Sequence, residues 1–227
     1  MKKTYDMKKI LTSILFCSIT IMAQNDPAAE DLLNKVSKNI KAYESMYINI
    51  NHNLSNEEEM INQTNKVSFV KKGDSYNVKW NNITFIYDGI KLYTINPDDE
   101  EVTVSSEDFD EESTITPNKI LTFFEEGYEF KMDIKQDITV TDYYEQKDRK
   151  VLQYVKLIPI DSESEIEYIL LAIEIKNNRI YKSIERGKNG TVTTYTITSF
   201  EVDLPLNDDL FIFNKKQYKD YYINDID

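Results

Sequence analysis

Apolar and polar residues alternate along most of the chain with a period of two, which is the pattern of β-strands that bury one face. The first such run starts at Met46, and after a polar break at residues 55–65 the alternation resumes at Val67. A last short segment, Leu210–Phe213, precedes a polar tail. The pattern predicts a mainly β fold of about eleven strands, those of the second half being expected at residues 128–134, 138–144, 151–160, 166–176, 180–186 and 191–202.

Two segments have helical rather than strand character. Asp26–Pro27 can start a helix because Asp is a good N-cap and Pro suits the first helical position. The helical spacing of the apolar residues that follow predicts a helix from about Pro27 to Tyr43. Thr116–Pro117 repeats this start before a short apolar run that Gly127 ends, so we expect a second, short helix in mid-chain. By count of elements the fold is therefore α+β.

The stretch Trp80–Pro97 has the signature of a β-hairpin around Asp88–Gly89, which is a strong turn signal. A two-residue turn at these positions would place Phe85 opposite Leu92 and Tyr87 opposite Ile90. One face of the hairpin would then be almost entirely apolar, and the other would mix polar residues with Ile86, Tyr93 and Ile95. Periodicity alone leaves open whether the broad apolar face packs on a core or on a ligand.

The chain opens like a secretory signal peptide. Four lysines precede the apolar run Ile10–Met22, which Ala23 follows, and this run is too short for a transmembrane helix. We expect cleavage after Ala23, with residues 1–23 as signal and 24–227 as a single domain, because no linker or repeat interrupts the pattern. Two alternatives stay open: translation could start at Met7, and Cys17 could be acylated, although Phe16 stands where a small residue is expected.

Charge and cysteine content narrow the function classes. Loss of four Lys and one Asp with the signal changes the net charge from −13 to −16. Such an acidic surface argues against binding nucleic acid and against resting on anionic lipid. The mature chain would hold no cysteine, so it forms no disulfide even in an export compartment.

The residues of common catalytic sites are scarce. His52 is the only histidine, which excludes a multi-histidine metal site, and its phase with Ile48 and Ile50 favours a strand position without a catalytic role. The chain has no G-x-S-x-G motif and no glycine-rich phosphate loop. Residues 98–112 are acidic but lack the spacing of a calcium loop. We expect no enzyme, no cofactor and no metal site.

Taken in order, several stretches resemble the LolA family of periplasmic lipoprotein carriers. They are VSFVKKGDSYNVKW, FIYDGIKLYTINPDDEEVTV, TPNKILTFF, NNRIYKSIERGKNGTVTTYTITSF and LFIFNKKQY, and the likeness covers essentially the whole mature chain. Its most specific parts are the Y-D-G-x-x-L-Y-x-x-N-P hairpin and the Thr-Pro helix start. The resemblance implies an incomplete antiparallel β-barrel over a hydrophobic cavity, which helices close as a lid.

The resemblance also implies roles for individual residues. In the family a basic residue at the end of an early strand, usually Arg followed by Pro, contacts the lid helix and controls opening. Lys72 followed by Gly73 matches that position here, and a lysine makes a point-charge contact without the planar fork of arginine. The implied lid residues are Ile120, Leu121 and Phe124, and the implied cavity residues are Phe69, Tyr76, Val78, Trp80, Phe85 and Leu92.

The function that the resemblance implies is transport of acylated lipoproteins through the periplasm. Each methylene exposed to water costs about 0.8 kcal/mol, so an acyl chain needs an apolar sheath during transit. The implied donor is an inner-membrane lipoprotein-releasing transporter, the outer-membrane acceptor is unknown, and we expect a monomer. Two alternatives stay open: a LolA-like lipid sensor that regulates a signalling protein, and a carrier of another lipid or glycolipid.

Overall fold

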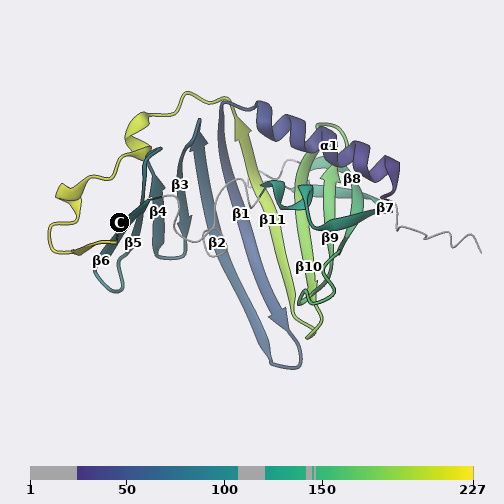
Figure 1. Ribbon diagram of the computed structural model, residues 1–227. Helices are drawn as coiled ribbons and strands as arrows, with labels where there is room; N and C mark the ends of the chain where they lie inside the picture. Colours follow the sequence, from purple (N-terminus) through teal and green to yellow (C-terminus); the bar gives the residue numbers. More distant parts are fainter. Residues whose placement is uncertain (1–24, 107–120, 142–144, 146, 227) are drawn as a thin grey trace, which may run out of the picture.

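The structure is a computed structural model that describes residues 25–106, 121–141, 145 and 147–226. The expected signal peptide and the expected lid residue Ile120 lie outside these ranges. Twelve strands form one sheet (Figure 1). They are β1 (Ser45–Asn56), β2 (Ile61–Lys72), β3 (Ser75–Trp80), β4 (Ile83–Tyr87), β5 (Lys91–Asn96), β6 (Glu101–Ser106), β7 (Tyr128–Thr141), β8 (Lys147–Pro159), β9 (Ile166–Glu174), β10 (Arg179–Gly187), β11 (Val192–Val202) and β12 (Tyr222–Asp225).

The N-terminal helix α1 (Pro27–Ala42) forms as predicted and ends one residue before the expected end at Tyr43. The side chain of Asp26 accepts a hydrogen bond from the Ala28 N–H at 2.9 Å, so the cap is the one that the sequence indicated. One stripe of the helix, from Ala29 to Ile40, is buried. Figure 1 shows α1 lying along the part of the sheet that holds β7 to β10. No helix within the described ranges is long and apolar enough to span a membrane.

The sheet has the strand order β12-β6-β5-β4-β3-β2-β1-β11-β10-β9-β8-β7. Pairing of β1 with β11 joins the two halves of the chain, and every pair is antiparallel except β12 with β6. The two end strands, β7 and β12, do not pair with each other, so the sheet stays open. The predicted mainly β fold with an incomplete barrel is confirmed, with twelve strands among the described residues instead of about eleven.

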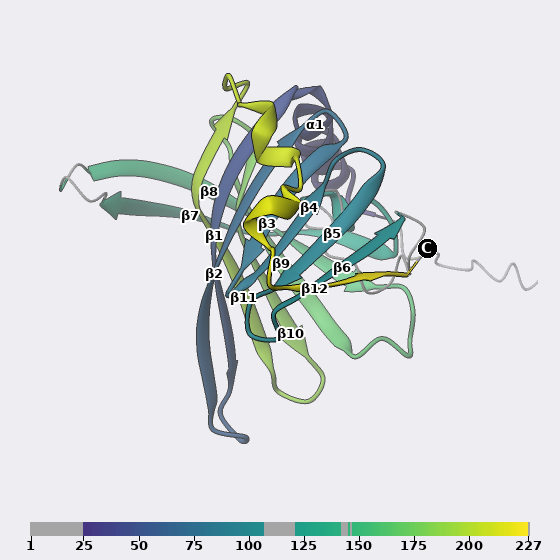
Figure 2. The ribbon, with the colours of Figure 1, turned by 90° about the vertical axis from the view of Figure 1, so that its left-hand side faces the viewer.

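Three expected elements differ from the structure. The polar break at residues 55–65 is instead mostly paired strand, because β1 and β2 continue their register as a long hairpin out to Asn56 and Ile61 (Figure 2). The two strands expected at 128–134 and 138–144 are the single strand β7, whose register shifts at a bulge between Met132 and Lys135. The last segment, Leu210–Phe213, falls half within the 3₁₀ helix η2 (Asp208–Phe211).

The β4–β5 hairpin turns one residue later than predicted. The Asp88 N–H donates to the Lys91 carbonyl at 3.2 Å, and the Asp88 side chain accepts from the N–H groups of Ile90 and Lys91. The turn is therefore Gly89–Ile90, with Gly89 at φ +97°. Tyr87 pairs with Leu92, whereas Phe85 pairs with Thr94. This shift changes each partner by two positions, so the paired strand residues keep their predicted faces, whereas Ile90, predicted opposite Tyr87, lies in the turn and is 77% exposed.

Apolar residues are buried on both faces of the sheet. The inner face, on which α1 packs, carries the largest cluster, with members from α1 and from most strands. On the outer face, Ile86, Ile95, Val102 and Val104 form a second cluster over β4 to β6. A third cluster around Leu152, Tyr154 and Ala172 lies on the outer face of the second half.

The C-terminal segment, residues 203–226, covers the second cluster. It holds η2, the 3₁₀ helix η3 (Lys215–Gln217) and β12, and Figure 2 shows it crossing the sheet over β3 to β6. Phe213 stacks on Tyr93 with ring centroids 4.6 Å apart and on Tyr218 at 5.4 Å. The tail expected to be polar is therefore an apolar cover. Its aromatic residues are irregularly spaced, which is why periodicity did not reveal them.

Candidate functional site

The six residues predicted to line a cavity share the inner face of neighbouring strands. Phe69 pairs with Val78, and Val78 pairs with Phe85. Two residues along, Tyr76 pairs with Tyr87, and Tyr87 pairs with Leu92. The sixth residue, Trp80, shares the face of Tyr76 and Val78 on β3. The structure thus brings together all six: Phe69, Tyr76, Val78, Trp80, Phe85 and Leu92.

Exposure divides this face into a closed and a more open part. Phe69, Val78 and Leu92 are between 0 and 6% exposed, whereas Trp80 and Phe85 are only partly buried. The central strand β11 shows the same openness, because none of its residues is buried. By contrast, Ile169, Leu171 and Ile173 on the inner face of β9 are 2% exposed or less. We define the open inner surface as Trp80, Phe85, Tyr195 and Ile197.

Tyr195 and Ile197 were not among the predicted site residues. They pair with His52 and Ile50 of β1, which places them on the inner face. The alternation TVTTYTITSF predicted a strand there, but alternation could not show that its inward residues would stay partly exposed. Sequence could have indicated these residues only through the pairing of β1 with β11, whose paired residues are about 150 positions apart.

Of the predicted lid residues, the structure describes two. Leu121 and Phe124 are 2% and 1% exposed and belong to the same inner cluster as the buried stripe of α1. Their segment is tied to α1 through Glu125, whose carboxylate accepts hydrogen bonds from Lys41 and Ser37. Burial raises the pKa of Glu125, but these bonds and the Lys41 charge outweigh it and lower the pKa overall. The role of these residues as a lid stays a prediction.

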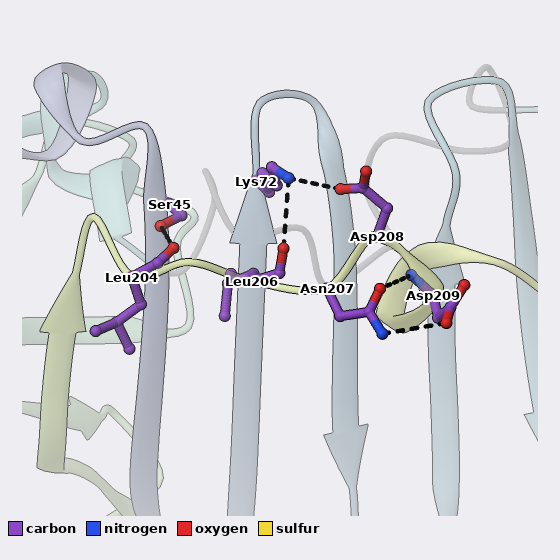
Figure 3. Close-up of polar contacts among 7 residues, drawn as sticks. All are labelled: Ser45, Lys72, Leu204, Leu206, Asn207, Asp208 and Asp209. Atoms are coloured by element: carbon purple, nitrogen blue, oxygen red, sulfur yellow. Dashed lines mark hydrogen bonds and ion pairs between the residues drawn. The ribbon is translucent and has the colours of Figure 1, made fainter.

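Lys72 lies at the end of β2 and contacts the C-terminal segment. Its ammonium is 2.6 Å from the Asp208 carboxylate and donates to the Leu206 carbonyl at 3.4 Å (Figure 3). Nearby, the Ser45 hydroxyl donates to the Leu204 carbonyl, so two strand ends hold this segment. Sequence reasoning missed Asp208 because it is 136 positions from Lys72 and nothing local indicates the pairing. Control of a lid by Lys72 stays a prediction.

His52 occupies the strand position that its phase predicted. It is 7% exposed, with its ring between Trp80 at 5.4 Å and Tyr195 at 4.9 Å. Burial lowers the pKa of His52, so the imidazole is neutral at neutral pH. Its Nδ1 atom has no hydrogen-bond partner in the described part of the chain. Within the described ranges, no three side chains of His, Cys, Asp or Glu are grouped so that they could hold a metal ion.

No family model and no curated protein matches this sequence. Among solved structures, the chain is similar to an uncharacterized conserved protein from Thermus thermophilus, with a TM-score of 0.53 and 9% identity over 87% of this chain and 99% of that one. It is also similar to LolA superfamily protein NE2245 from Nitrosomonas europaea (TM-score 0.40, 14% identity, 82% and 97% covered). A third similar structure is Mycobacterium tuberculosis lipoprotein LppX (TM-score 0.44, 11% identity, 82% and 100% covered).

These similarities concern the fold alone, because all three identities are far below the level at which function can be transferred. Of the three, the Thermus thermophilus protein has a TM-score above 0.5, and its likeness shows a similar overall fold. The open twelve-stranded sheet with its N-terminal helix agrees with the incomplete barrel that the sequence predicted.

Proposed function

We propose that this protein is a periplasmic carrier that holds the acyl chains of lipoproteins against its inner face and moves them from the inner to the outer membrane. The observation that supports this proposal is the open inner surface. Core-facing residues in the middle of a sheet are normally covered, yet Tyr195 and Ile197 on the central strand β11 stay partly exposed. Partly exposed aromatic and aliphatic side chains that face inward provide a surface for an apolar ligand.

The chemistry of this surface suits a ligand that must be taken up and released. Burial of an acyl chain gains about 0.8 kcal/mol per methylene, and this gain does not depend on direction. Trp80, Phe85 and Ile197 offer such contact without a charged group that would fix one orientation. Binding of this kind needs no bond making or breaking, so we propose a carrier and not an enzyme.

The partners of this proposal follow from the transport route. An inner-membrane lipoprotein-releasing transporter would load the carrier, and an outer-membrane acceptor would receive the cargo. The carrier would act as a monomer, as residues 24–227, once the signal peptide at residues 1–23 has directed it to the periplasm.

Displacement of an apolar fluorescent dye by an acylated peptide tests the proposal. The wild-type protein should bind the dye and release it when the acylated peptide is added. Phe85→Glu should lower the affinity for the dye and for the acylated peptide by about tenfold or more, because it places a charge where the acyl chain would lie. Ile90→Glu is the matched control, since Ile90 is 77% exposed on the turn of the same hairpin and should bind normally.

Three results would contradict or redirect the proposal. Failure of the wild-type protein to bind dye or acylated peptide would exclude a lipid carrier. If Phe85→Glu and the wild type bound the acylated peptide equally well, the cargo would not bind on the inner face. Mass spectrometry of molecules that copurify from the periplasm then identifies the cargo, and free glycolipids in place of triacylated lipoproteins would favour the alternative cargo.

A further inference from the structure

Four polar side chains lie on the inner face, at or next to the open inner surface. Tyr195 pairs with His52 on one side and Ser183 on the other. Two residues along β11, Thr193 pairs with Glu185, and Glu185 pairs with Ile169 of the inner cluster. Tyr128 packs against that cluster from β7. We call these side chains the inner polar group: His52, Tyr128, Glu185 and Tyr195.

Burial disfavours the charged form of every member of the inner polar group. It raises the pKa of the Glu185 carboxyl and of the Tyr195 and Tyr128 hydroxyls, and the charge on Glu185 raises both tyrosine pKa values further. It also lowers the pKa of His52. Within the described ranges, no basic side chain forms an ion pair with Glu185. Its β10 neighbours Lys182 and Arg186 pair with Ala172 and Tyr168, whose side chains lie on the outer face.

Burial of these polar side chains costs free energy unless new hydrogen bonds replace those that they made to water. A buried polar atom without a hydrogen bond loses its solvation and gains nothing in return. The His52 Nδ1 atom is buried without a partner among the described residues. The Glu185 side chain is partly buried between Thr193 and Ile169, and this burial raises the pKa of its carboxyl. A ligand that donates a hydrogen bond to the Glu185 carboxylate would replace the water that this carboxylate loses on partial burial.

We propose that the inner polar group is a head-group subsite, in which Glu185 accepts a hydrogen bond from an uncharged or cationic donor on the cargo. This inference rests on the proposed function, because an acyl chain on the open inner surface would bring its head to this place. Tyr195 belongs to both sets of residues. Glu185 lies beside Thr193, four strand residues and so about 13 Å from Ile197.

The chemistry of the subsite defines what it accepts. Hydroxyl, amide N–H and ammonium groups can all donate to the carboxylate, and the tyrosine hydroxyls can both donate and accept. An anionic head group would be repelled by Glu185 in a partly dry site and by the mature chain, whose net charge is −16. The subsite therefore selects head groups by charge and by hydrogen-bond donation, whereas the open inner surface selects only for an apolar chain.

Four amphiphiles with the same tetradecyl-length chain test the subsite by dye displacement from the full-length mature protein. Myristoylglycerol and tetradecylammonium donate hydrogen bonds, tetradecyltrimethylammonium is a cation without a donor, and myristate is an anion. Both donors should bind about tenfold more tightly than myristate, which is the ratio expected for one hydrogen bond to a charged group. The trimethylammonium compound should bind more weakly than tetradecylammonium, and a tie between these two would mean that charge alone is recognised.

Glu185→Gln should abolish the advantage of tetradecylammonium over myristate, with the ratio taken within each variant. Glu201→Gln is the matched control, because Glu201 is exposed on the outer face of β11, and it should keep the wild-type ratio. Failure of every amphiphile to displace the dye would overturn the proposed function itself. Displacement by all four with equal affinity, or an unchanged ratio in Glu185→Gln, would overturn the subsite and leave acyl-chain carriage standing. The wild-type ranking alone decides the question if Glu185→Gln does not fold.

Discussion

The β4–β5 hairpin has two apolar faces that the molecule treats differently. On the outer face, Ile86 and Ile95 are 7% and 2% exposed beneath the C-terminal segment. On the inner face, Phe85 stays partly exposed even though it faces the largest apolar cluster of the protein. The outer face is therefore covered by the chain itself, whereas part of the inner face stays partly exposed, and in the proposed carrier an acyl chain would cover it.

The C-terminal segment covers the outer face and helix α1 covers the inner face, and the two are attached to the sheet in different ways. The C-terminal segment is held by the pairing of β12 with β6 and by Lys72 at its other end. Helix α1 has a backbone anchor at its start, where the Asp26 N–H donates to the Phe130 carbonyl at 2.9 Å. Nearer its end the helix is held through side chains, as in the hydrogen bond from Asn39 to the Asn177 carbonyl at 3.1 Å. The C-terminal segment, which covers the outer face, is part of the sheet through β12, whereas α1 only packs on the inner face. This difference agrees with a closed outer face and with the proposal that the inner face admits a ligand.

The largest expected effect is on the outer face. Ile95→Ala should lower the free energy of unfolding by about 2–5 kcal/mol, because it leaves a cavity under a fixed cover. Ile90→Ala, at the exposed turn of the same hairpin, should change it by less than about 0.5 kcal/mol. Denaturant unfolding measures both. A loss below about 1 kcal/mol for Ile95→Ala would show that the C-terminal segment does not pack as described.

The second prediction concerns Asp26 at the start of α1, whose contribution to stability should depend on pH. The hydrogen bond from Ala28 is the main cause that lowers the pKa of Asp26, with Met132 contributing. A lowered folded-state pKa means that the carboxylate stabilises the fold above the ordinary aspartate range and that this contribution disappears as the pH falls below about 4.

Asp26→Asn should therefore lower the melting temperature at pH 7, and the difference from the wild type should shrink below about pH 4. Asp31→Asn, which removes an exposed pair with Lys35, is the control and should have a smaller effect. A difference for Asp26→Asn that grows on acidification would contradict the role of its carboxylate.

The smallest expected effect on stability is at Lys72. The Lys72–Asp208 pair is exposed, so a double-mutant cycle with Lys72→Met and Asp208→Asn should give a coupling of about 1 kcal/mol or less. The same variants separate the two roles considered for this lysine. If Lys72→Met slows cargo release while Asp208→Asn does not, control of the lid by Lys72 is supported. If both variants release cargo at the same rate, the role of Lys72 is only to attach the C-terminal segment to the sheet.

The sequence predicted those parts of the fold whose signal is local. The cap at Asp26, the stripe of α1 and the inner face shared by Tyr76, Phe85 and Leu92 are set by neighbours in the chain. The turn at Gly89–Ile90 was displaced by one residue because the Asp88 side chain, and not the dipeptide signal, determines where the chain reverses.

What the sequence could not predict depends on distant contacts. The packing of the aromatic residues of the C-terminal segment could not be predicted, because Phe213 stacks on Tyr93, about 120 positions away in the chain. Glu185 looks like any surface carboxylate on a strand until its pairing with Ile169 places it inside. The candidate site was predicted on β2 to β5, where the resemblance implied cavity residues, but its part on β11 was not predicted.

Fluorescence of Trp80, the only tryptophan of the chain, tests the central claim most directly. A myristoylglycerol brominated near the end of its acyl chain should quench Trp80 saturably, because Trp80 lies on the open inner surface. A Trp80→Phe, Phe213→Trp variant reports from the outer face and should bind the same probe without quenching. Quenching of the outer reporter, or binding without quenching of Trp80, would contradict the account.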